Sequence, residues 1–240
     1  MSPPETPPDT LDYVLLRRRR KTISVSVSDD GEVEVRAPLR APQRAIEEVL
    51  SLHFDWLVEQ KRASEERLAR ARARRFEDGE AVPYMGRTLR LRLEEPVLGG
   101  RAARLDGDEL VLTPPAGVSE ADRRGALREA VGRFLVERAA DVFHERHVAM
   151  AKLVGVSAVR LTIKDMRSRW GSCGPKRRMS LNWRLILAPL EVIDYVIAHE
   201  LTHIRHPDHS RRFWADLSRS LPGWRPARDW LKRHGDDLRF

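Results

Sequence analysis

Two histidines with a glutamate beside the first form the stretch of this chain best suited to chemistry: His199, Glu200 and His203. On a helix, residues four apart lie on one face, so both imidazoles are directed at one point. Glu200 lies about 100° around the helix from His199, where its carboxylate is better placed to reach a water molecule than to bind the metal. Two neutral imidazoles, a third ligand and an open water position are typical of a catalytic zinc site. The spacing therefore predicts a metal-dependent hydrolase.

Three downstream residues are candidates for the third ligand: His206, His209 and Asp216. His206 would share the ligand face of a continuing helix, but Pro207 follows it and disfavours helical geometry at the preceding residue. The helix is therefore expected to end just before Pro207, in a turn that returns His209 to the metal. The position of His209, six residues beyond the second motif histidine, equals that in the extended zincin motif H-E-x-x-H-x-x-G-x-x-H. We favour His209, with Asp216 as the alternative.

The surrounding sequence predicts a helix that carries the pair. Pro189 suits a first helical turn, where its missing N–H costs nothing, and Glu191 complements the positive end of the helix dipole. An apolar stripe at helical spacing follows, made of Leu190, Ile193, Ile197, Leu201 and Ile204. The two histidines lie on roughly the opposite side, flanked by Val196. In a helix covered on most of its circumference, metal binding is the simplest account of paired imidazoles.

Length and composition set bounds on the whole protein. A chain of 240 residues, 41% of them hydrophobic, can form one large domain or two small ones with ample core. No stretch approaches the roughly 18 consecutive apolar residues of a membrane span, and the N-terminus lacks the basic and apolar regions of a secretory signal. Cys173 is the only cysteine, which excludes an intramolecular disulfide. We therefore expect a cytoplasmic protein that does not associate with membranes.

The formal net charge of +8 favours affinity for polyanions, but the composition weakens this signal. Of 44 basic residues only six are lysines, an arginine bias that a GC-rich genome would also produce. Two basic runs stand out, residues 17–21 and the set Arg67, Arg70, Arg72, Arg74 and Arg75. Binding sites for single-stranded nucleic acid typically carry aromatic residues among the basic ones. These two runs have none, which argues against such a site. We expect solvated surfaces there, with at most weak nucleic-acid binding.

The order of predicted elements favours an α+β fold. Strands are expected over residues 13–16, 22–27, 32–35, 88–93, 101–105, 109–113, 159–163 and 179–183. Helices are expected from Pro42 towards Phe76, over 119–153 behind a capping box of Ser119 and Asp122, over the metal-binding segment, over 210–220 and around Trp230.

The same pattern predicts how the chain is divided. Residues 1–12 are expected to form a disordered proline-rich tail, and residues 13–240 a single domain. The segment 114–117 (Pro-Pro-Ala-Gly) is the best internal boundary, between a strand-rich part over 13–115 and a helical part over 116–240.

Other residues able to do chemistry are weaker candidates. His144 and His147 lie three apart on a predicted helix, where a surface pair is favoured over metal ligands. Cys173 lies in the segment Gly171–Gly174, which is expected to form a turn between strands. Because the best-placed histidines are assigned to the metal, thiol catalysis by Cys173 is not expected.

Four further residues are also weaker candidates: Arg169, Trp170, Asn182 and Arg184. One of them could stabilise an oxyanion or a phosphate, but clamping of the sheet to the metal helix is an equally good interpretation. We therefore leave them out of the predicted catalytic set.

Four stretches of the C-terminal half match a known family in order and spacing: residues 168–173 (SRWGSC), 181–186 (LNWRLI), 194–203 (DYVIAHELTH) and 209–214 (HSRRFW). In these, the chain resembles the YgjP-like metallopeptidase domain family, a zincin-fold group. Residues 84–87 (YMGR) before a strand extend the likeness, which covers roughly residues 15–230. One departure is the sequence His-Pro-Asp over 206–208, where the family usually shows fewer helix-breaking residues.

The resemblance implies zinc bound by His199, His203 and His209, with Glu200 as the catalytic base. It also implies a small sheet beside the metal helix, with the strand over 179–183 near the cleft. It leaves the substrate open, because the metallopeptidase label follows the fold and nucleotide hydrolysis has also been assigned within the family.

The leading hypothesis is therefore a zinc metallopeptidase. The first alternative is a metal-dependent nucleoside triphosphate pyrophosphohydrolase, which would use arginines for the phosphates. The second is a basic nucleic-acid-binding protein with a structural metal. It is disfavoured, because structural zinc is normally four-coordinate with cysteine ligands.

Overall fold

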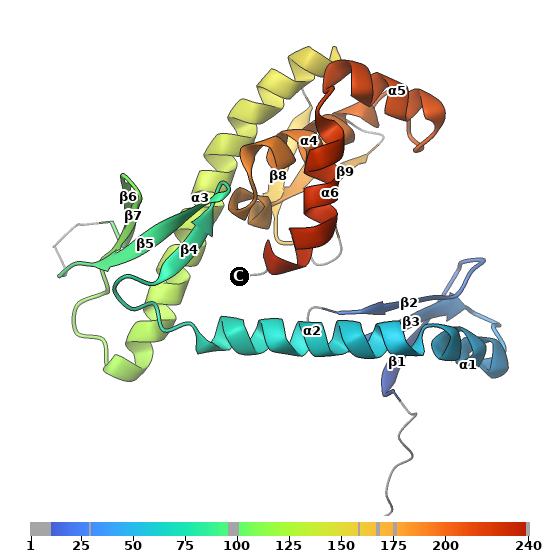
Figure 1. Ribbon diagram of the computed structural model, residues 1–240, viewed down its shortest axis with the longest axis horizontal. Coiled ribbons are helices and arrows are strands. Elements are labelled where there is room, and N and C mark those ends of the chain that lie inside the picture. Colours follow the sequence, from blue (N-terminus) through green and yellow to red (C-terminus); the bar gives the residue numbers. More distant parts are fainter. Residues whose placement is uncertain are drawn as a thin grey trace, which may run out of the picture. The chain divides into compact units, whose positions relative to one another are not determined.

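The computed structural model describes residues 11–28, 30–95, 101–157, 159–166, 169–174 and 177–238 (Figure 1). The chain divides into two compact units, Met1–Arg74 and Arg75–Phe240. Its class is α+β, as expected, with small open sheets in the N-terminal half and mostly helices in the C-terminal half. Except for its last two residues, the tail expected over 1–12 lies outside the described residues.

The first unit combines a three-stranded sheet with two helices. The sheet contains β1 (Tyr13–Arg18), β2 (Ser24–Val27) and β3 (Val33–Pro38) in the order β1-β3-β2, with β3 parallel to β1 and antiparallel to β2. Alternation along β3 points Val35 and Ala37 inward, where they meet Ile46 of α1 (Gln43–Leu52) in a small core.

The long helix expected from Pro42 towards Phe76 is two helices, α1 and α2 (Phe54–Ala73). His53 separates them, because its φ of −111° and ψ of 12° depart from helical geometry. A change at one residue leaves the apolar periodicity nearly intact, so the pattern gave no sign of the break.

The second unit begins with a four-stranded sheet. Its strands are β4 (Ala81–Tyr84), β5 (Arg87–Leu93), β6 (Ala103–Asp106) and β7 (Glu109–Leu112), in the order β4-β5-β7-β6. The hairpin expected around Gly107 is confirmed, and this glycine has a φ of +60°. Strand β4 was not expected from the sequence. It contains Pro83 and lies at a sheet edge, which is where a strand tolerates a residue without an N–H.

Helix α3 (Glu120–Val154) follows, and both of its ends have recognisable caps. The Ser119 side chain accepts a hydrogen bond from the Asp122 backbone N–H, so the expected capping interaction is confirmed. At the other end Gly155 adopts the left-handed conformation, with a φ of +71°. The expected surface histidine pair is wrong for His147, which is buried and accepts a hydrogen bond from the Val159 N–H. His144 is exposed.

The second unit also contains a three-stranded sheet, which lies beside the C-terminal helices. It contains β8 (Arg160–Lys164), β9 (Gly171–Gly174) and β10 (Arg178–Asn182) in the order β8-β10-β9, with β10 parallel to β8 and antiparallel to β9. The turn expected over Gly171–Gly174 is therefore wrong. The segment Gly-Ser-Cys-Gly has little intrinsic strand preference, and its extended conformation depends on pairing with β10.

The remaining elements are helical: η1 (Trp183–Leu187, a 3-10 helix), α4 (Leu190–Thr202), α5 (Arg211–Ser220), α6 (Trp224–His234) and η2 (Gly235–Leu238). α4 packs against α3, α5, α6 and β9, which explains why it is apolar on most of its circumference. Ile193, Ile197 and Leu201 of the expected stripe are fully buried. α4 thus holds the candidate motif rigidly within the larger core.

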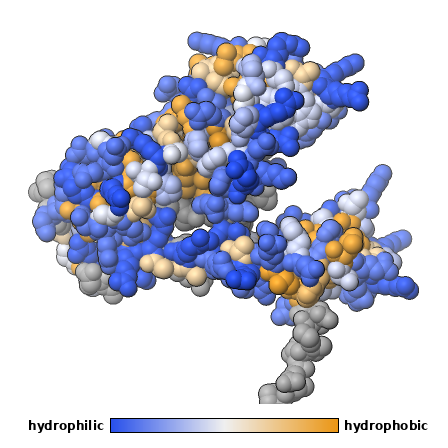
Figure 2. Space-filling model, in the orientation of Figure 1, coloured by the Kyte–Doolittle hydropathy of each residue, from blue (hydrophilic) through white to orange (hydrophobic). Residues whose placement is uncertain are grey.

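The boundary between the two compact units lies at Arg74 and Arg75, whereas the internal boundary was expected at 114–117. That boundary falls between β7 and α3, inside the second unit, where strands give way to helices. On the face that Figure 2 shows, hydrophilic side chains dominate the surface of each unit. Among the described helices, none has the length and apolar composition needed to cross a bilayer.

Candidate metal centre

Three histidines converge at the C-terminal end of α4. His199 lies in the last turn of the helix, His203 is its C-cap residue, and His209 lies in the turn that leads into α5. One ring nitrogen from each lies within 4.8 Å of those from the other two, and the Nε2 atoms of His199 and His209 are 3.0 Å apart. Asp208 accepts a hydrogen bond from the Ser210 backbone N–H at 3.2 Å, which turns the chain at His209.

The donor set fits a zinc ion. Tetrahedral zinc with Zn–N bonds of about 2.0–2.1 Å places its ligand nitrogens roughly 3.3 Å apart. The 3.0 Å between the Nε2 atoms of His199 and His209 is close to that spacing. Burial, together with the neighbouring His203 and His209, lowers the pKa of His199 to about 3. Burial also lowers the pKa of His203. Both rings are therefore neutral near pH 7, the state in which imidazole binds a metal.

Hydrogen bonding determines which nitrogens are available. The His203 Nδ1 lies 2.9 Å from the His206 carbonyl oxygen, and because a carbonyl only accepts, Nδ1 carries the proton and Nε2 is free. A hydrogen bond from the ring nitrogen that does not bind the metal is typical of metal-binding histidines. The Nδ1 of His199 is buried and has no hydrogen-bond partner in the described part of the chain. Its Nε2, which faces His209, is the nitrogen available to an ion.

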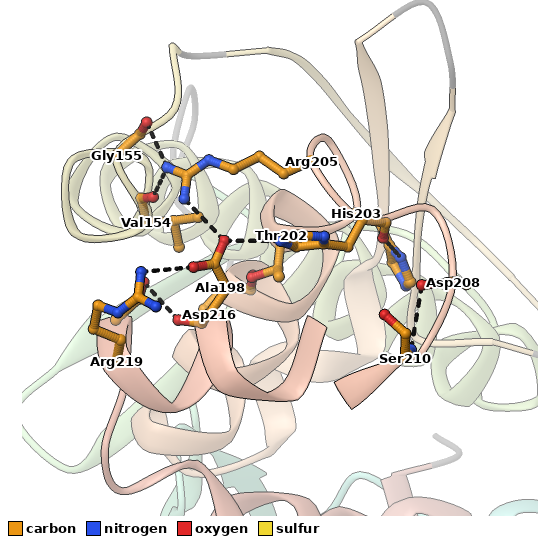
Figure 3. A network of polar contacts seen from close by, with 12 residues as sticks. Val154, Gly155, Ala198, Thr202, His203, Arg205, Asp208, Ser210, Asp216 and Arg219 are labelled. Atoms are coloured by element: carbon orange, nitrogen blue, oxygen red, sulfur yellow. Dashed lines mark hydrogen bonds and ion pairs between the residues drawn. The ribbon is translucent and has the colours of Figure 1, made fainter. Parts of the chain in front are cut away.

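The two competing candidates, His206 and Asp216, are engaged with each other. The His206 Nε2 lies 3.0 Å from the Asp216 carboxylate, which also accepts hydrogen bonds from Arg205 at 3.0 Å and Arg219 at 2.9 Å (Figure 3). The regular helix also ends earlier than expected, at Thr202, whose carbonyl accepts from the N–H groups of both Arg205 and His206. The turn therefore starts before Pro207.

Glu200 lies beside the histidines and against β9. It is only 8% exposed, and the Cys173 backbone N–H donates a hydrogen bond to its carboxylate. A Cβ atom placed on Gly171 would lie 2.6 Å from the Glu200 Cγ, so the glutamate occupies space that any other residue at 171 would fill. Burial raises the pKa of Glu200 to about 7, although the positive charge of Arg169 and the Cys173 N–H oppose the shift. The group therefore changes protonation near neutral pH.

The motif residues near the sheet mostly serve the framework. The buried Asn182 side chain donates to the Met166 carbonyl at 2.7 Å and accepts from the Arg184 N–H, and its backbone N–H donates to the Trp170 carbonyl. Arg184 pairs with Asp165 and lies over the Trp183 ring. These contacts clamp the chain ahead of β9 onto β10, whereas Arg169 is exposed and acts on Glu200 through its charge.

Two further features of the site were not predicted from the sequence. Gly171 and the Cys173 N–H form the wall against Glu200, which required knowledge that β9 is a strand. Phe213 and Trp214 of α5 pack against the histidines. The ring centroids of Phe213 and His199 are 4.8 Å apart, and those of Trp214 and His209 are 5.7 Å apart.

The environment of Cys173 disfavours thiol catalysis. Burial, and to a smaller extent the negative charge of Glu200, raises the pKa of the Cys173 thiol, so the nucleophilic thiolate is disfavoured.

The sequence model of the YgjP-like metallopeptidase domain matches residues 21–234. The chain belongs to this family. Family membership and the histidine cluster identify this YgjP-like protein as a metal-dependent, peptidase-like hydrolase.

The metallopeptidase zymogen of Pyrococcus abyssi abylysin is similar to this YgjP-like chain at 21% sequence identity and a TM-score of 0.36, covering 40% of this chain and 94% of its own. No curated protein matches the chain.

Proposed function

We propose that the protein is a zinc-dependent peptidase in which His199, His203 and His209 hold the metal and Glu200 is the general base. The observation that carries this proposal is the convergence of three imidazole nitrogens within 4.8 Å of one another, together with the buried Glu200, which follows His199 on α4. Neutral ligands and a separate carboxylate are what metal-assisted hydrolysis requires.

Each group of the site has a distinct task. A zinc ion held by the three nitrogens would supply Lewis acidity and lower the pKa of a water molecule towards neutrality. Glu200 takes the proton of the attacking water and passes it to the leaving amine. The Cys173 N–H donates a hydrogen bond to the Glu200 carboxylate and keeps it oriented. Phe213 and Trp214 pack against the imidazole rings of His199 and His209.

The edge strand β9 supports a peptide as substrate. One side of β9 pairs with β10, while its other side pairs with no strand in the described part of the chain. An extended peptide can add to such an edge through main-chain hydrogen bonds.

A nucleoside triphosphate is the second candidate substrate. The exposed guanidinium of Arg169 acts electrostatically on Glu200 and is able to bind a phosphate near the base. The two candidates differ in what they need from the protein: main-chain pairing along β9 for a peptide, and positive charge at Arg169 for a nucleotide.

Zinc content and turnover, measured on three variants, test the proposal. Wild-type protein should hold about one zinc per chain. Glu200→Gln should keep that zinc and lose about 10²–10⁴-fold in turnover, because general-base catalysis contributes that much. His203→Ala and His209→Ala should lose zinc and activity together. Full activity in Glu200→Gln, or normal zinc in His203→Ala, contradicts the proposal.

A substrate panel completes the test. Zinc-loaded protein should be offered unstructured polypeptides and nucleoside triphosphates, with Arg169→Ala as the variant that separates them. We expect cleavage of polypeptide that survives Arg169→Ala. Turnover of the nucleotide alone, abolished by Arg169→Ala, would instead establish the second candidate.

A further inference from the structure

Asp216 is the centre of a polar network next to the three histidines, not a member of their cluster. Its side chain is 13% exposed and accepts hydrogen bonds from Arg205, His206 and Arg219, at 3.0, 3.0 and 2.9 Å (Figure 3). Burial raises the pKa of this carboxyl group, but the hydrogen bonds from Arg205 and His206 outweigh that effect and the pKa is lowered. Asp216 is therefore ionised at neutral pH.

The network connects the two parts of the chain that flank His209. Asp216 lies on α5, which begins two residues after His209. Its partners Arg205 and His206 lie in the turn that precedes His209. The carboxylate thus joins the chain before this histidine to the helix after it, and closes the loop that carries it.

Arg205 anchors the same network to the core. Its guanidinium donates to the Val154 carbonyl and, at 2.7 Å, to the Gly155 carbonyl, where α3 ends (Figure 3). Cationic groups are favourable at a helix C-terminus, because the last carbonyls have no partners within the helix. A Cβ atom on Gly155 would lie 2.9 Å from the guanidinium, so the contact is close.

One further hydrogen bond extends the network to a second histidine of the cluster. The His206 side chain donates to Asp216, and its backbone carbonyl accepts from the His203 Nδ1–H at 2.9 Å. The position of His206 therefore determines where that carbonyl lies and how the His203 ring is turned. By holding His206, Asp216 orients the His203 ring. By closing the loop, it fixes the position of His209.

We infer that Asp216 is a positioning residue for the metal centre, holding two of its three histidines in place without touching the metal. This inference rests on the proposed function, since it assigns Asp216 a role toward the metal that His199, His203 and His209 would bind. Residues that orient metal ligands in this way typically contribute 10–100-fold to metal affinity.

The test measures zinc affinity by competition with a chromophoric chelator on the full chain. Asp216→Ala should raise the zinc dissociation constant about 10–100-fold. The absorption bands of the cobalt-substituted protein should also change, because they report the coordination geometry. His206→Gln keeps a side-chain N–H for Asp216 and should stay near wild type, whereas His206→Ala should reproduce part of the Asp216→Ala loss.

Asp194→Ala is the matched control, because Asp194 is also a nearly buried carboxylate with an arginine partner. Its side chain is 14% exposed and accepts two hydrogen bonds from Arg146, at 2.7 and 2.6 Å, joining α3 to α4. Its loss should lower the denaturation midpoint about as much as Asp216→Ala does, but leave zinc affinity and the cobalt spectrum unchanged. This separates positioning of ligands from general destabilisation.

Several results would overturn the inference. Equal losses of zinc affinity in Asp216→Ala and Asp194→Ala would make the effect one of stability alone. Complete loss of zinc in Asp216→Ala with normal zinc in His209→Ala would make Asp216 a ligand. If Asp216→Ala does not fold, identical affinities of His206→Gln and His206→Ala contradict the role. Absence of zinc from the wild-type protein would instead contradict the proposed function.

Discussion

At the level of single residues, Glu200 depends on a neighbour that has no side chain. A Cβ atom at Gly171 would lie 2.6 Å from the Glu200 Cγ and 2.8 Å from its Oε1, distances that force one of the two residues to move. Gly171 is fixed by pairing with β10, so the glutamate side chain is the part that yields. The site therefore requires glycine at 171 for steric reasons.

Gly171→Ala should lower turnover severely and leave zinc content near normal, because it displaces the base and none of the three histidines. The loss should approach the roughly 10²–10⁴-fold expected when a general base is removed. Gly174→Ala is the control in the same strand, since its nearest contact would be the Arg178 carbonyl at an ordinary 3.8 Å. Equal losses in the two variants would show that any side chain in β9 is harmful and that Glu200 is not the cause.

The buried carboxyl of Glu200 also affects stability, with a sign that follows from its pKa. Burial raises that pKa from 4.5 to about 7, so between these values the folded protein holds a proton that the unfolded chain has lost. Stability of the metal-free protein therefore falls as pH rises from 4.5 to 7, and the contribution of the neutral carboxyl group is absent above that range.

Glu200→Gln should consequently stabilise the metal-free protein above pH 7 and have little effect below pH 4.5. The rise of the pKa from 4.5 to about 7 corresponds to a gain of at most about 3 kcal/mol. Denaturant unfolding of the chelator-treated wild type and variant across this pH range measures the gain. A gain of the same size at all pH values would attribute it to packing.

The spacing of the histidines and the glutamate predicted the candidate ligands and base, but not the residues that surround them. The positions of His199, His203 and Glu200 follow from helical periodicity, which is local, and Pro207 indicated a turn that brings His209 back. The contribution of Gly171 depends on the pairing of β9 with β10, which is not local. Periodicity carries no information about such pairing.

At the level of elements, the long, strongly patterned helices were predictable and the short, paired segments were not. α3 and its Ser119 cap follow from residues close in sequence. The break at His53 and the strand β9 depend on single backbone angles or on partners elsewhere in the chain. His147 was expected at the surface and is buried, with a hydrogen bond from the Val159 N–H.

One predicted consequence concerns the contact between the four-stranded sheet and the start of α4. Gly86, in the turn between β4 and β5, has a φ of +76°, and a Cβ atom there would lie 3.0–3.1 Å from Pro189, the N-cap of α4. The Met85 N–H donates to the Ile186 carbonyl at 2.7 Å, which fixes the turn at this place. Gly86→Ala therefore meets two penalties, backbone strain and a clash.

Gly79→Ala separates these penalties, because Gly79 has a φ of +79° and a Cβ atom there would have no neighbour within 4 Å. Gly79→Ala should cost about 1–2 kcal/mol from the left-handed backbone alone. Gly86→Ala should cost about 1–3 kcal/mol more, the usual penalty of overpacking. Denaturant midpoints measure both, and equal values would mean that the turn moves away from Pro189 without cost.

At the level of the whole molecule, the two compact units have separate hydrophobic cores. The smaller core is centred on Val35, Ala37 and Ile46, and the residues of the larger one lie between Phe76 and Leu238. Both the candidate metal centre and the polar network of Asp216 belong to the second unit. Unfolding of the first unit need not disturb the site, so the two units are expected to unfold in separate steps.

Zinc should therefore raise the midpoint of only one of the two unfolding transitions. A ligand that binds only the folded state adds about 4 kcal/mol at a free concentration 1,000 times its dissociation constant, and that gain belongs to the unit that contains the site. In calorimetry of the full chain, zinc should raise the midpoint of the second unit and leave that of the first unchanged. A fragment of residues 75–240 should fold and show the zinc-dependent transition alone.

Fluorescence assigns the transitions to the units, because Trp56 is the only one of the six tryptophans that precedes Arg75. Trp56→Phe should remove the fluorescence change of the zinc-independent transition and leave that of the zinc-dependent transition in place. His203→Ala should abolish the zinc effect while both transitions remain. If circular dichroism and fluorescence instead follow a single transition that zinc shifts as a whole, the two cores are coupled. The metal centre would then contribute to the stability of the entire chain.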